Sequence, residues 1–466
     1  MDPRKPARPV SACIAWLSTV VVAAVGLGAC SSTKTAVGGS LLGSVADENT
    51  RRDTLLLPLT PSAALARLNY QYKTSYATSE MLLIGQANGL RATTLLKYGP
   101  PAAWTEVWTA TVDAKAVPDT ITITPTSINV DSAAGFIVTF GGFAADSLDD
   151  AFLSAWTTPI DWEPTDPVTT PLPPAFLGTQ LFADRRLALV PDSGTTLAIT
   201  SVPVTAATLA QVWDFADTLS LALQGGPTAT MVQLVSRDAY LSYSPYFYFN
   251  VNAHVTSKVL GASAERDTVI ALTVRPTHDV FRLERLPGSV APTPQPNTLL
   301  LTAGVSWHGY AKINRFDIPH LADSAGVLAR NVTVNSAVLE VQLASGGQSY
   351  LRDQAQLQLY ALAEPFDLDS ATVGSTLFVN RSYLLTSAFQ TNEAASSTAD
   401  VRRFEIGDML NRWVQDGAQN DGLVLRLGQE DRRVDVVEVV GLRLILTTTI
   451  PPAFGEGRAR TTQGGA

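Results

Sequence analysis

Hydrophobic and polar residues alternate along most of this chain in short runs, with the two-residue period of a β-strand. In the clearest run, Pro245–Asn252, the alternation places Phe247 and Phe249 inward and Tyr246 and Tyr248 outward. Gly, Pro, Asn and Ser residues separate such runs throughout the chain. Many short strands between turn residues predict antiparallel β-sandwiches, so we expect an all-β fold.

The strand pattern breaks near residue 260 and divides the chain into two blocks. The predicted order is a signal peptide at 1–29, a flexible tether at 30–53, a first β-sandwich at 54–256, a linker at 257–267, a second β-sandwich at 268–450 and a disordered tail at 451–466. An insertion rich in Pro and Trp runs from Asp146 to Leu177 in the first block. The sequence therefore predicts two sandwiches in tandem.

The two blocks look like copies of one another. The segment Trp213–Gly226 aligns with Phe404–Gly417 without a gap, and four positions are identical: Asp217 with Asp408, Leu219 with Leu410, Gln224 with Gln415 and Gly226 with Gly417. In each copy the Asp is expected to cap a helix of about two turns that stops at Gly. Each sandwich should thus carry one short helix, with Trp213 and Trp413 in the cores.

The N-terminus has the pattern of a secretory signal. Arg4, Lys5 and Arg8 precede an uncharged apolar run, Val10–Gly28. The run ends in Leu-Gly-Ala-Cys30, which resembles the lipobox of bacterial lipoproteins. That resemblance implies acylation of Cys30, which would become the new N-terminus, and the Ser that follows it implies sorting to the outer membrane. A plain signal peptide or a spanning helix is the alternative, since such a run could just cross a bilayer.

The second block contains several short motifs in a fixed order. Arg315-Phe316-Asp317 precedes a strand that opens on Ser336-Ala337, and Arg403–Ile406, Trp413 and Asn420–Leu425 follow. In order and spacing these motifs resemble DNRLRE-type modules. Over about Asp267–Thr449 the resemblance implies a jelly-roll-like β-sandwich of secreted and cell-surface bacterial proteins, related to carbohydrate-binding modules. The first block departs from that pattern, because Lys97-Tyr98-Gly99 replaces R-F-D.

Composition excludes several classes of function. A net charge of −9 argues against nucleic-acid binding, which needs a basic surface, so we expect no nucleic-acid partner. Two Cys and four His, with His254, His278, His308 and His320 never in ligand spacing, argue against thiolate or imidazole metal clusters, so no cofactor is expected. The acidic segments Asp146–Asp150 and Glu364–Asp369 are expected to be solvated loops, with a structural calcium ion as the alternative.

No signature of a hydrolase elbow, a zinc protease, a phosphate loop or a dinucleotide fold occurs, so no catalytic residue is assigned. Sugar rings stack on flat side chains, and the candidate ligand-binding aromatics are Trp307 and Tyr310 in a predicted turn and Trp156 and Trp162 in the insertion. We therefore expect a lipid-anchored, non-catalytic glycan-binding or adhesive envelope protein, with membrane, polysaccharide or envelope proteins as partners. The alternatives are a structural component of a surface complex and, third, a polysaccharide-processing enzyme.

Overall fold

The computed structural model describes residues 50–57, 65–72, 75–143, 151–187, 198–226, 231–239, 241–259, 262–289, 293–313, 333–344, 355–369, 379–389, 400–415 and 420–449. The predicted signal peptide, Cys30, Asp146–Asp150, Arg315–Asp317, His320 and the tail lie outside the described residues. The described part is nearly all β-structure, as predicted, with two short helices, α3 (Ala206–Val212) and α5 (Gly407–Gln415). Neither helix is long and apolar enough to span a membrane.

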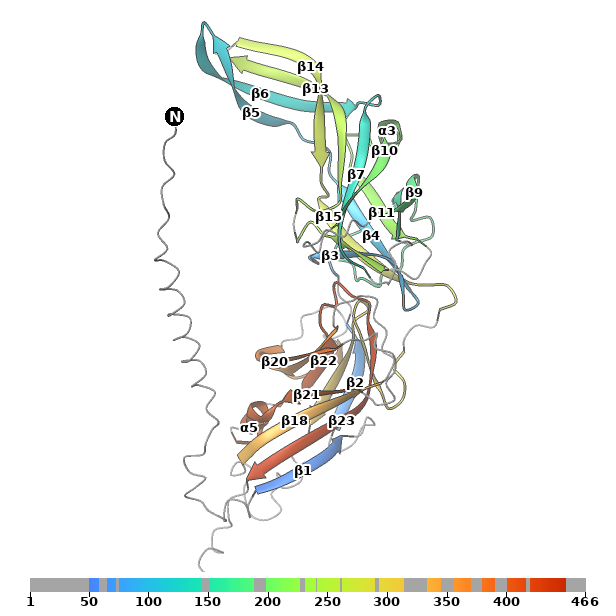
Figure 1. Ribbon diagram of the computed structural model, residues 1–466, viewed down its shortest axis with the longest axis vertical. Coiled ribbons are helices and arrows are strands. Elements are labelled where there is room, and N and C mark those ends of the chain that lie inside the picture. Colours follow the sequence, from blue (N-terminus) through green and yellow to red (C-terminus); the bar gives the residue numbers. More distant parts are fainter. Residues whose placement is uncertain are drawn as a thin grey trace, which may run out of the picture.

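Two five-stranded antiparallel sheets form a β-sandwich, the lower body in Figure 1, which we call the base sandwich. The first sheet consists of β1 (Thr50–Leu57), β23 (Val436–Thr449), β18 (Thr333–Leu343) and β21 (Asp400–Glu405), with β16 (Leu299–Thr302) also on β23. The second consists of β2 (Leu65–Gln71), β17 (Trp307–Ile313), β22 (Leu423–Leu427), β19 (Ala355–Leu362) and β20 (Val379–Phe389). Leu301, Leu339, Leu425 and Leu444, none more than 1% exposed, fill the space between the sheets.

The base sandwich is discontinuous in sequence. Strand β1 pairs with β23 from Thr50↔Thr449 to Leu57↔Leu442, and β2 pairs with β17. The predicted first block, 54–256, is therefore wrong at its start, because its opening strand belongs to the sandwich of the second block. A strand's own hydrophobic pattern shows which face is buried but does not identify its partner, which here lies at the other end of the chain.

All described strands from β3 to β15 form one thirteen-stranded sheet, which we call the inserted body. Its members are β3 (Met81–Ala87), β4 (Leu90–Tyr98), β5 (Trp104–Val112), β6 (Lys115–Ile128), β7 (Ala133–Phe143), β8 (Phe152–Thr157), β9 (Gln180–Arg186), β10 (Ala198–Thr205), β11 (Leu219–Gly225), β12 (Met231–Val235), β13 (Tyr246–Val259), β14 (Ala262–Val274) and β15 (His278–Arg285). The core of the inserted body includes Phe136, Phe247 and Phe249, all fully buried, as alternation predicted for the last two.

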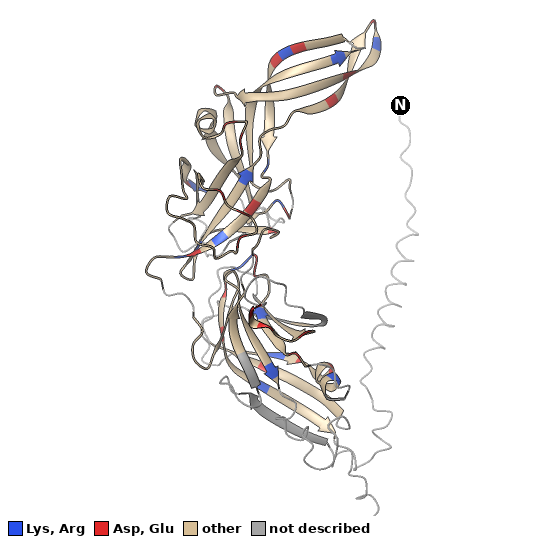
Figure 2. Cartoon of the chain, turned by 180° about the vertical axis from the view of Figure 1, so that it is seen from behind, with Lys and Arg blue, Asp and Glu red and all other residues tan. Residues whose placement is uncertain are grey.

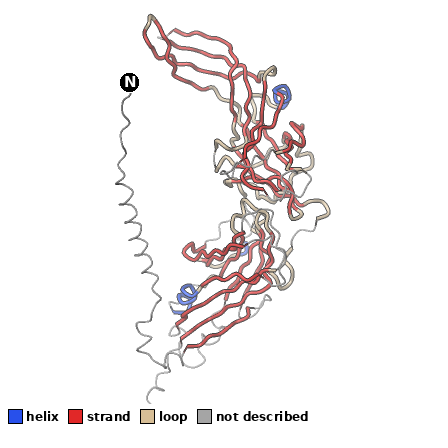
Figure 3. Tube along the Cα trace, viewed as in Figure 1, coloured by secondary structure: helices blue, strands red, loops and turns tan. Residues whose placement is uncertain are grey.

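The predicted linker at 257–267 is wrong. Strands β13 and β14 form a long antiparallel hairpin there, from Phe247↔Val274 to Val259↔Ala262. With β5 and β6 the hairpin projects from the inserted body as four strands that we call the arm (Figures 1 and 3). Residues 262–267 of β14 are all exposed, so this strand needs no apolar pattern, and its polar sequence resembles that of a linker.

The predicted helix after Asp217 is a strand instead. Leu219, Leu221 and Leu223 of β11 are buried at alternate positions, and β11 pairs with β4 on one side and β8 on the other. The aligned segment of the second block is the helix α5, as predicted, so the aligned copies differ in structure here. Trp213 and Trp413 are both buried, which confirms their predicted place in the cores.

The two bodies meet through a shared apolar cluster and backbone-directed hydrogen bonds. Tyr76 and Phe281 of the inserted body pack with Val305, Trp307 and Val434 of the base sandwich. The Asn88 and Gln233 side-chain amides also donate to carbonyls of the segment between β22 and β23. That segment leads directly into β23, whose far end carries the Thr50↔Thr449 pair. The first and last described residues therefore leave the base sandwich at the end opposite the inserted body (Figure 1).

Asp279 is a carboxyl buried in the inserted body. Its oxygens accept hydrogen bonds from the Ser236 hydroxyl at 3.1 Å and the Arg237 amide at 2.7 Å. Burial raises the pKa of Asp279 from 3.8 to about 6, and the Arg237 hydrogen bond only partly opposes the shift. Because the folded state holds this proton more tightly than the unfolded chain does, the stabilising contribution is full below pH 4 and is lost as the pH rises through 6.

We expect Asp279→Asn to remove this pH dependence. Relative to wild type, the free energy of unfolding of the variant should rise by about 2.4 kcal/mol between pH 4 and pH 7, measured by urea unfolding at each pH. The exposed Asp217→Asn is the control and should follow wild type. An identical pH dependence in Asp279→Asn and wild type would contradict the assignment.

Candidate functional site

The four aromatic residues predicted to bind ligand do not form one surface. Trp156 lies half-buried on β8 and Trp162 in the loop that follows, both in the inserted body, whereas Trp307 and Tyr310 lie on β17 of the base sandwich. Trp162 is 5% exposed, and the Lys97 ammonium lies 4.8 Å from its ring centroid. The structure thus separates the two pairs and leaves no free ring face at Trp162.

Trp307 and Tyr310 are half-buried and have different partners. Trp307 packs into the cluster that joins the two bodies. The ring of Tyr310 stacks on Phe366 at 4.1 Å between centroids with 18° between planes, and its hydroxyl donates to the Asp421 carbonyl. Both rings therefore already have structural packing partners.

Tyr310 belongs instead to a polar and aromatic cluster on the outer face of the second base sheet. The register pairs His308 with Tyr70, Tyr310 with Val424, and Arg426 with Gln358. Because side chains alternate along a strand, these residues share one face while Gly309 and Ala311 point to the core. His308, Tyr360 and Tyr70 are buried on this face, and Arg426 and Gln358 are half-buried.

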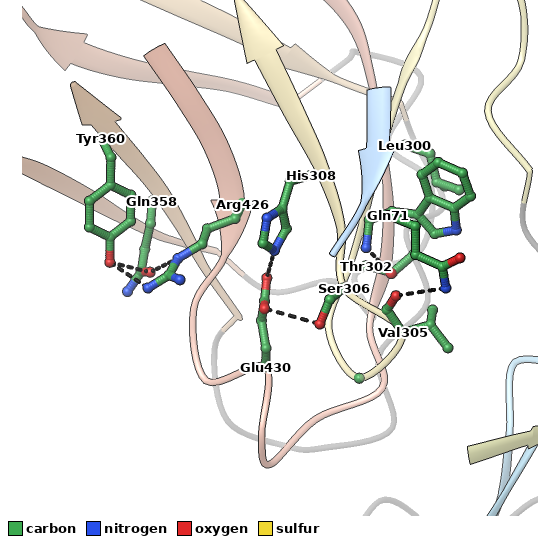
Figure 4. Close-up of polar contacts among 12 residues, drawn as sticks. Gln71, Leu300, Thr302, Val305, Ser306, His308, Gln358, Tyr360, Arg426 and Glu430 are labelled. Atoms are coloured by element: carbon green, nitrogen blue, oxygen red, sulfur yellow. Dashed lines mark hydrogen bonds and ion pairs between the residues drawn. The ribbon is translucent and has the colours of Figure 1, made fainter. Parts of the chain in front are cut away.

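His308 and Glu430 form a buried hydrogen-bonded pair at one end of the cluster (Figure 4). The His308 Nε2 lies 2.6 Å from the Glu430 Oε1, and their side chains are 4% and 10% exposed. The Ser306 hydroxyl donates to the other Glu430 oxygen at 3.2 Å and lies 2.8 Å from the hydroxyl of Tyr76 in the inserted body. This chain of hydrogen bonds connects the second sheet to the inserted body.

Arg426 organises the other end of the cluster. Its guanidinium donates to the Tyr360 hydroxyl at 2.6 Å and to the side-chain oxygen of Gln358 at 3.1 Å. The central carbon of the guanidinium lies 4.6 Å from the Tyr360 ring centroid. Figure 4 shows the Arg426 guanidinium reaching toward Tyr360 and Gln358, and His308 pointing at Glu430. Each charged group of the cluster therefore has a defined partner.

The buried phenols around Glu430 stay protonated. Burial raises the pKa of Tyr70 and of Tyr76, and the negative charge of Glu430 raises both further. The ring of Tyr70 also packs edge-on against the His308 imidazole, with centroids 5.4 Å apart. Neutral phenols beside a buried carboxylate–imidazole pair avoid adding a second negative charge there.

The order of groups in the cluster differs from that of a serine–histidine–carboxylate triad. In such a triad the serine hydroxyl donates to the histidine, and the carboxylate holds the histidine. Here the Ser306 hydroxyl donates to Glu430 and not to His308. The buried pair instead links β17 to the loop that contacts the inserted body, so the arrangement holds the two bodies together.

The other polar candidates are dispersed. His254 pairs with Asp267 and Glu265 on the arm, and Glu364, Asp367 and Asp369 lie exposed in the loop after β19. Within the described ranges, no three His, Cys, Asp or Glu residues form a group that could hold a metal ion. The calcium alternative at Asp146–Asp150 concerns residues that the structure does not describe.

The sequence analysis did not single out Arg426, Tyr360, Gln358 and Glu430. A signal for the first three exists, because polar residues at alternate positions of strongly apolar strands mark one outer face, as in Gln358 and Tyr360. Glu430 carries no such signal, since it lies in a loop. The fold brings Glu430 to His308. The two residues are 122 positions apart in the sequence, so no local pattern indicates the pair.

We expect His308→Ala to destabilise the fold by about 3 kcal/mol, because Glu430 would remain buried without its imidazole partner. Guanidinium unfolding monitored by tryptophan fluorescence measures the loss. The matched control is His254→Ala, since His254 also pairs with acidic side chains, Glu265 and Asp267, but its own side chain is 42% exposed. The control should change stability by no more than about 0.5 kcal/mol. Equal losses of unfolding free energy in the two variants would contradict a larger contribution from the buried pair.

Two comparisons with known proteins found no match. No protein-family model matches the chain, and no curated protein matches it in sequence.

Proposed function

We propose that this protein is a lipid-anchored, non-catalytic component of a bacterial cell envelope that binds glycans. It is held through Cys30, with the base sandwich next to the membrane and the arm directed away from it. The outer membrane follows from the Ser after Cys30 and the lipobox resemblance. The DNRLRE-type resemblance supports the ligand class.

One observation carries this proposal. The first described residue, Thr50, pairs with Thr449 at the end of the base sandwich that faces away from the inserted body. A chain anchored at Cys30 would therefore enter at the base and place the inserted body and the arm farthest from the anchor (Figure 1). An elongated molecule with its anchor at one end and a projecting arm at the other is suited to contacting material outside the membrane.

The surface supports an uncharged ligand over a polyanion. Only 16% of the residues of the chain are charged, and its net charge is −9. Figure 2 shows Lys and Arg positions scattered over the described parts of both bodies and interspersed with Asp and Glu. A polyanionic ligand would require basic residues gathered in one place.

A role in assembly is the second candidate, and the arm itself favours it. Among the described strands, β5 pairs only with β6, and β14 pairs only with β13. Each therefore has a second edge at which a strand of another protein could add. In that case the ligand would be an envelope protein rather than a polysaccharide.

Fractionation of expressing cells tests anchor and ligand together. We expect the wild-type chain to sediment with membranes, and those membranes to bind polysaccharide-coated beads. Cys30→Ala should move the chain, and with it the bead binding, into the soluble fraction. Membrane retention of Cys30→Ala would argue for a spanning helix. Absence of bead binding in both fractions, with envelope proteins co-purifying instead, would favour the assembly role.

A further inference from the structure

Strand β5 presents two tryptophans and one glutamate on a single face of the arm. Trp104, Glu106 and Trp108 occupy alternate positions, so their side chains lie on the same side of the sheet. The Trp104 indole N–H donates to one Glu106 oxygen at 2.9 Å, and the Trp108 indole N–H donates to the other at 2.7 Å. The three side chains therefore form a continuous strip, which we call the indole strip.

The shared carboxylate fixes how both rings lie. Two tryptophans four residues apart in a strand have Cα atoms about 13 Å apart. Because both N–H edges reach toward Glu106 between them, each ring edge points along the strand. These two hydrogen bonds lower the pKa of the Glu106 carboxyl, which consequently stays ionised and keeps accepting from both indoles.

The two ends of the strip differ in burial. Trp104 packs against the small apolar cluster of the arm that contains Ile121, Ile123 and Val255. Trp108 is 51% exposed, and it alone is exposed among the tryptophans that the structure describes. The strip is thus anchored at Trp104 and open to solvent at Trp108.

The chemistry of the strip matches a sugar chain. The C–H face of a pyranose packs on an indole ring, and a carboxylate accepts hydrogen bonds from sugar hydroxyls. Glu106 is fully exposed and retains lone pairs beyond those used by the indoles. A ring next to a carboxylate can therefore bind the apolar face and the hydroxyl edge of the same ligand.

Local charge favours a neutral sugar chain at Trp108. The buried Asp119 lies directly across from Trp108 on β6, where it accepts the Ser257 hydroxyl at 2.8 and 2.9 Å. With Glu106 it places two carboxyl groups next to Trp108, which opposes polyanions such as uronic-acid polymers there, while Arg266 on the same face lies nearer Trp104. A cage for a cationic headgroup would need ring faces converging on one point, whereas these rings lie along one strand.

We infer that the indole strip Trp104–Glu106–Trp108 is a binding site for a neutral polysaccharide chain, which stacks on the outer face of Trp108 and hydrogen-bonds to Glu106. This inference rests on the proposed glycan-binding function and assigns that function to one site. Trp108 lies level with Asp119 and Val259, the last residue of β13, and so belongs to the outer half of the arm. The site is thus presented far from the base.

The test uses the full chain, purified in detergent, and depletion binding to insoluble cellulose, mannan and β-1,3-glucan. Trp108→Ala should weaken binding to the polysaccharide that wild type binds by at least about tenfold. The matched control is Val107→Ala, because Val107 is its neighbour on the same strand, points to the opposite face and is 71% exposed. Its binding should remain within about twofold of wild type, since it makes no stacking contact. Trp108→Tyr, which keeps a ring, should retain most of the binding.

Acrylamide quenching of tryptophan fluorescence provides a second readout. The bound polysaccharide should protect an indole in wild type and in Val107→Ala but not in Trp108→Ala. Wild-type binding that Trp108→Ala leaves unchanged would overturn the site while leaving the glycan function intact. Equal losses in Val107→Ala and Trp108→Ala would also overturn it. If wild type binds none of the polymers, the proposed glycan function fails, and the site fails with it. Should Trp108→Ala not fold, Trp108→Leu, which keeps apolar bulk but has no ring, should lose the binding that Trp108→Tyr and Val107→Ala retain, and equal binding by all three variants would overturn the site.

Discussion

The structure depends on the closure of the base sandwich by strands from the two ends of the described chain. Strand β1 completes the first sheet on β23, and β2 completes the second sheet on β17. Everything from β3 to β15 must therefore leave the sandwich after β2 and return before β16. Closing so long a loop costs only a few kcal/mol more than closing a short one, because the entropy grows with the logarithm of loop length. This pairing makes the central part of the chain an insertion and places both described ends at one end of the base.

The closure places the inserted body opposite the chain ends only if that body is held in a fixed orientation on the base sandwich. Two segments of the base achieve this, the turn between β16 and β17 and the loop between β22 and β23. Val305 and Val434 contribute apolar contacts to the inserted body, and Ser306 and Glu430 contribute the polar chain that ends on Tyr76. In the same loop Arg433 and Asp435 form an ion pair in which both side chains are 1% exposed. Buried pairs of this kind are sensitive to loss of one partner, so they favour one arrangement of the loop.

Periodicity predicted local structure well and long-range structure poorly. The alternation in β13 correctly placed Phe247 and Phe249 in the core and Tyr248 in solvent. It could not show that β1 pairs with β23, because many partners satisfy the same pattern of buried faces. The helix predicted at Leu219–Gly225 is wrong for a related reason. Leucines at alternate positions fit β11, but an Asp before them and a Gly after them also fit a capped helix.

For the candidate sites, too, the sequence predicted local arrangement better than packing and exposure. The sequence identified tryptophans in turns as ligand-binding residues, and the fold uses Trp162 and Trp307 for packing. The indole strip was overlooked because it lies inside a strand, although its W-x-E-x-W spacing already places three side chains on one face. What could not be foreseen is exposure, since Trp108 is open only because the arm extends beyond the core of the inserted body.

The closure can be tested by a disulfide between its two strands. Thr54 and Ile445 are direct partners in the β1–β23 register, so a Thr54→Cys/Ile445→Cys chain, with Cys13 and Cys30 replaced by Ser, should oxidise readily. The disulfide-linked peptide would be identified by mass spectrometry. A Thr54→Cys/Val440→Cys chain is the control, because Val440 lies five residues along β23 from that partner, a separation of about 16 Å. Efficient linkage in the first chain and not in the second is predicted. Linkage no better in the first chain than in the control would contradict the discontinuous base sandwich.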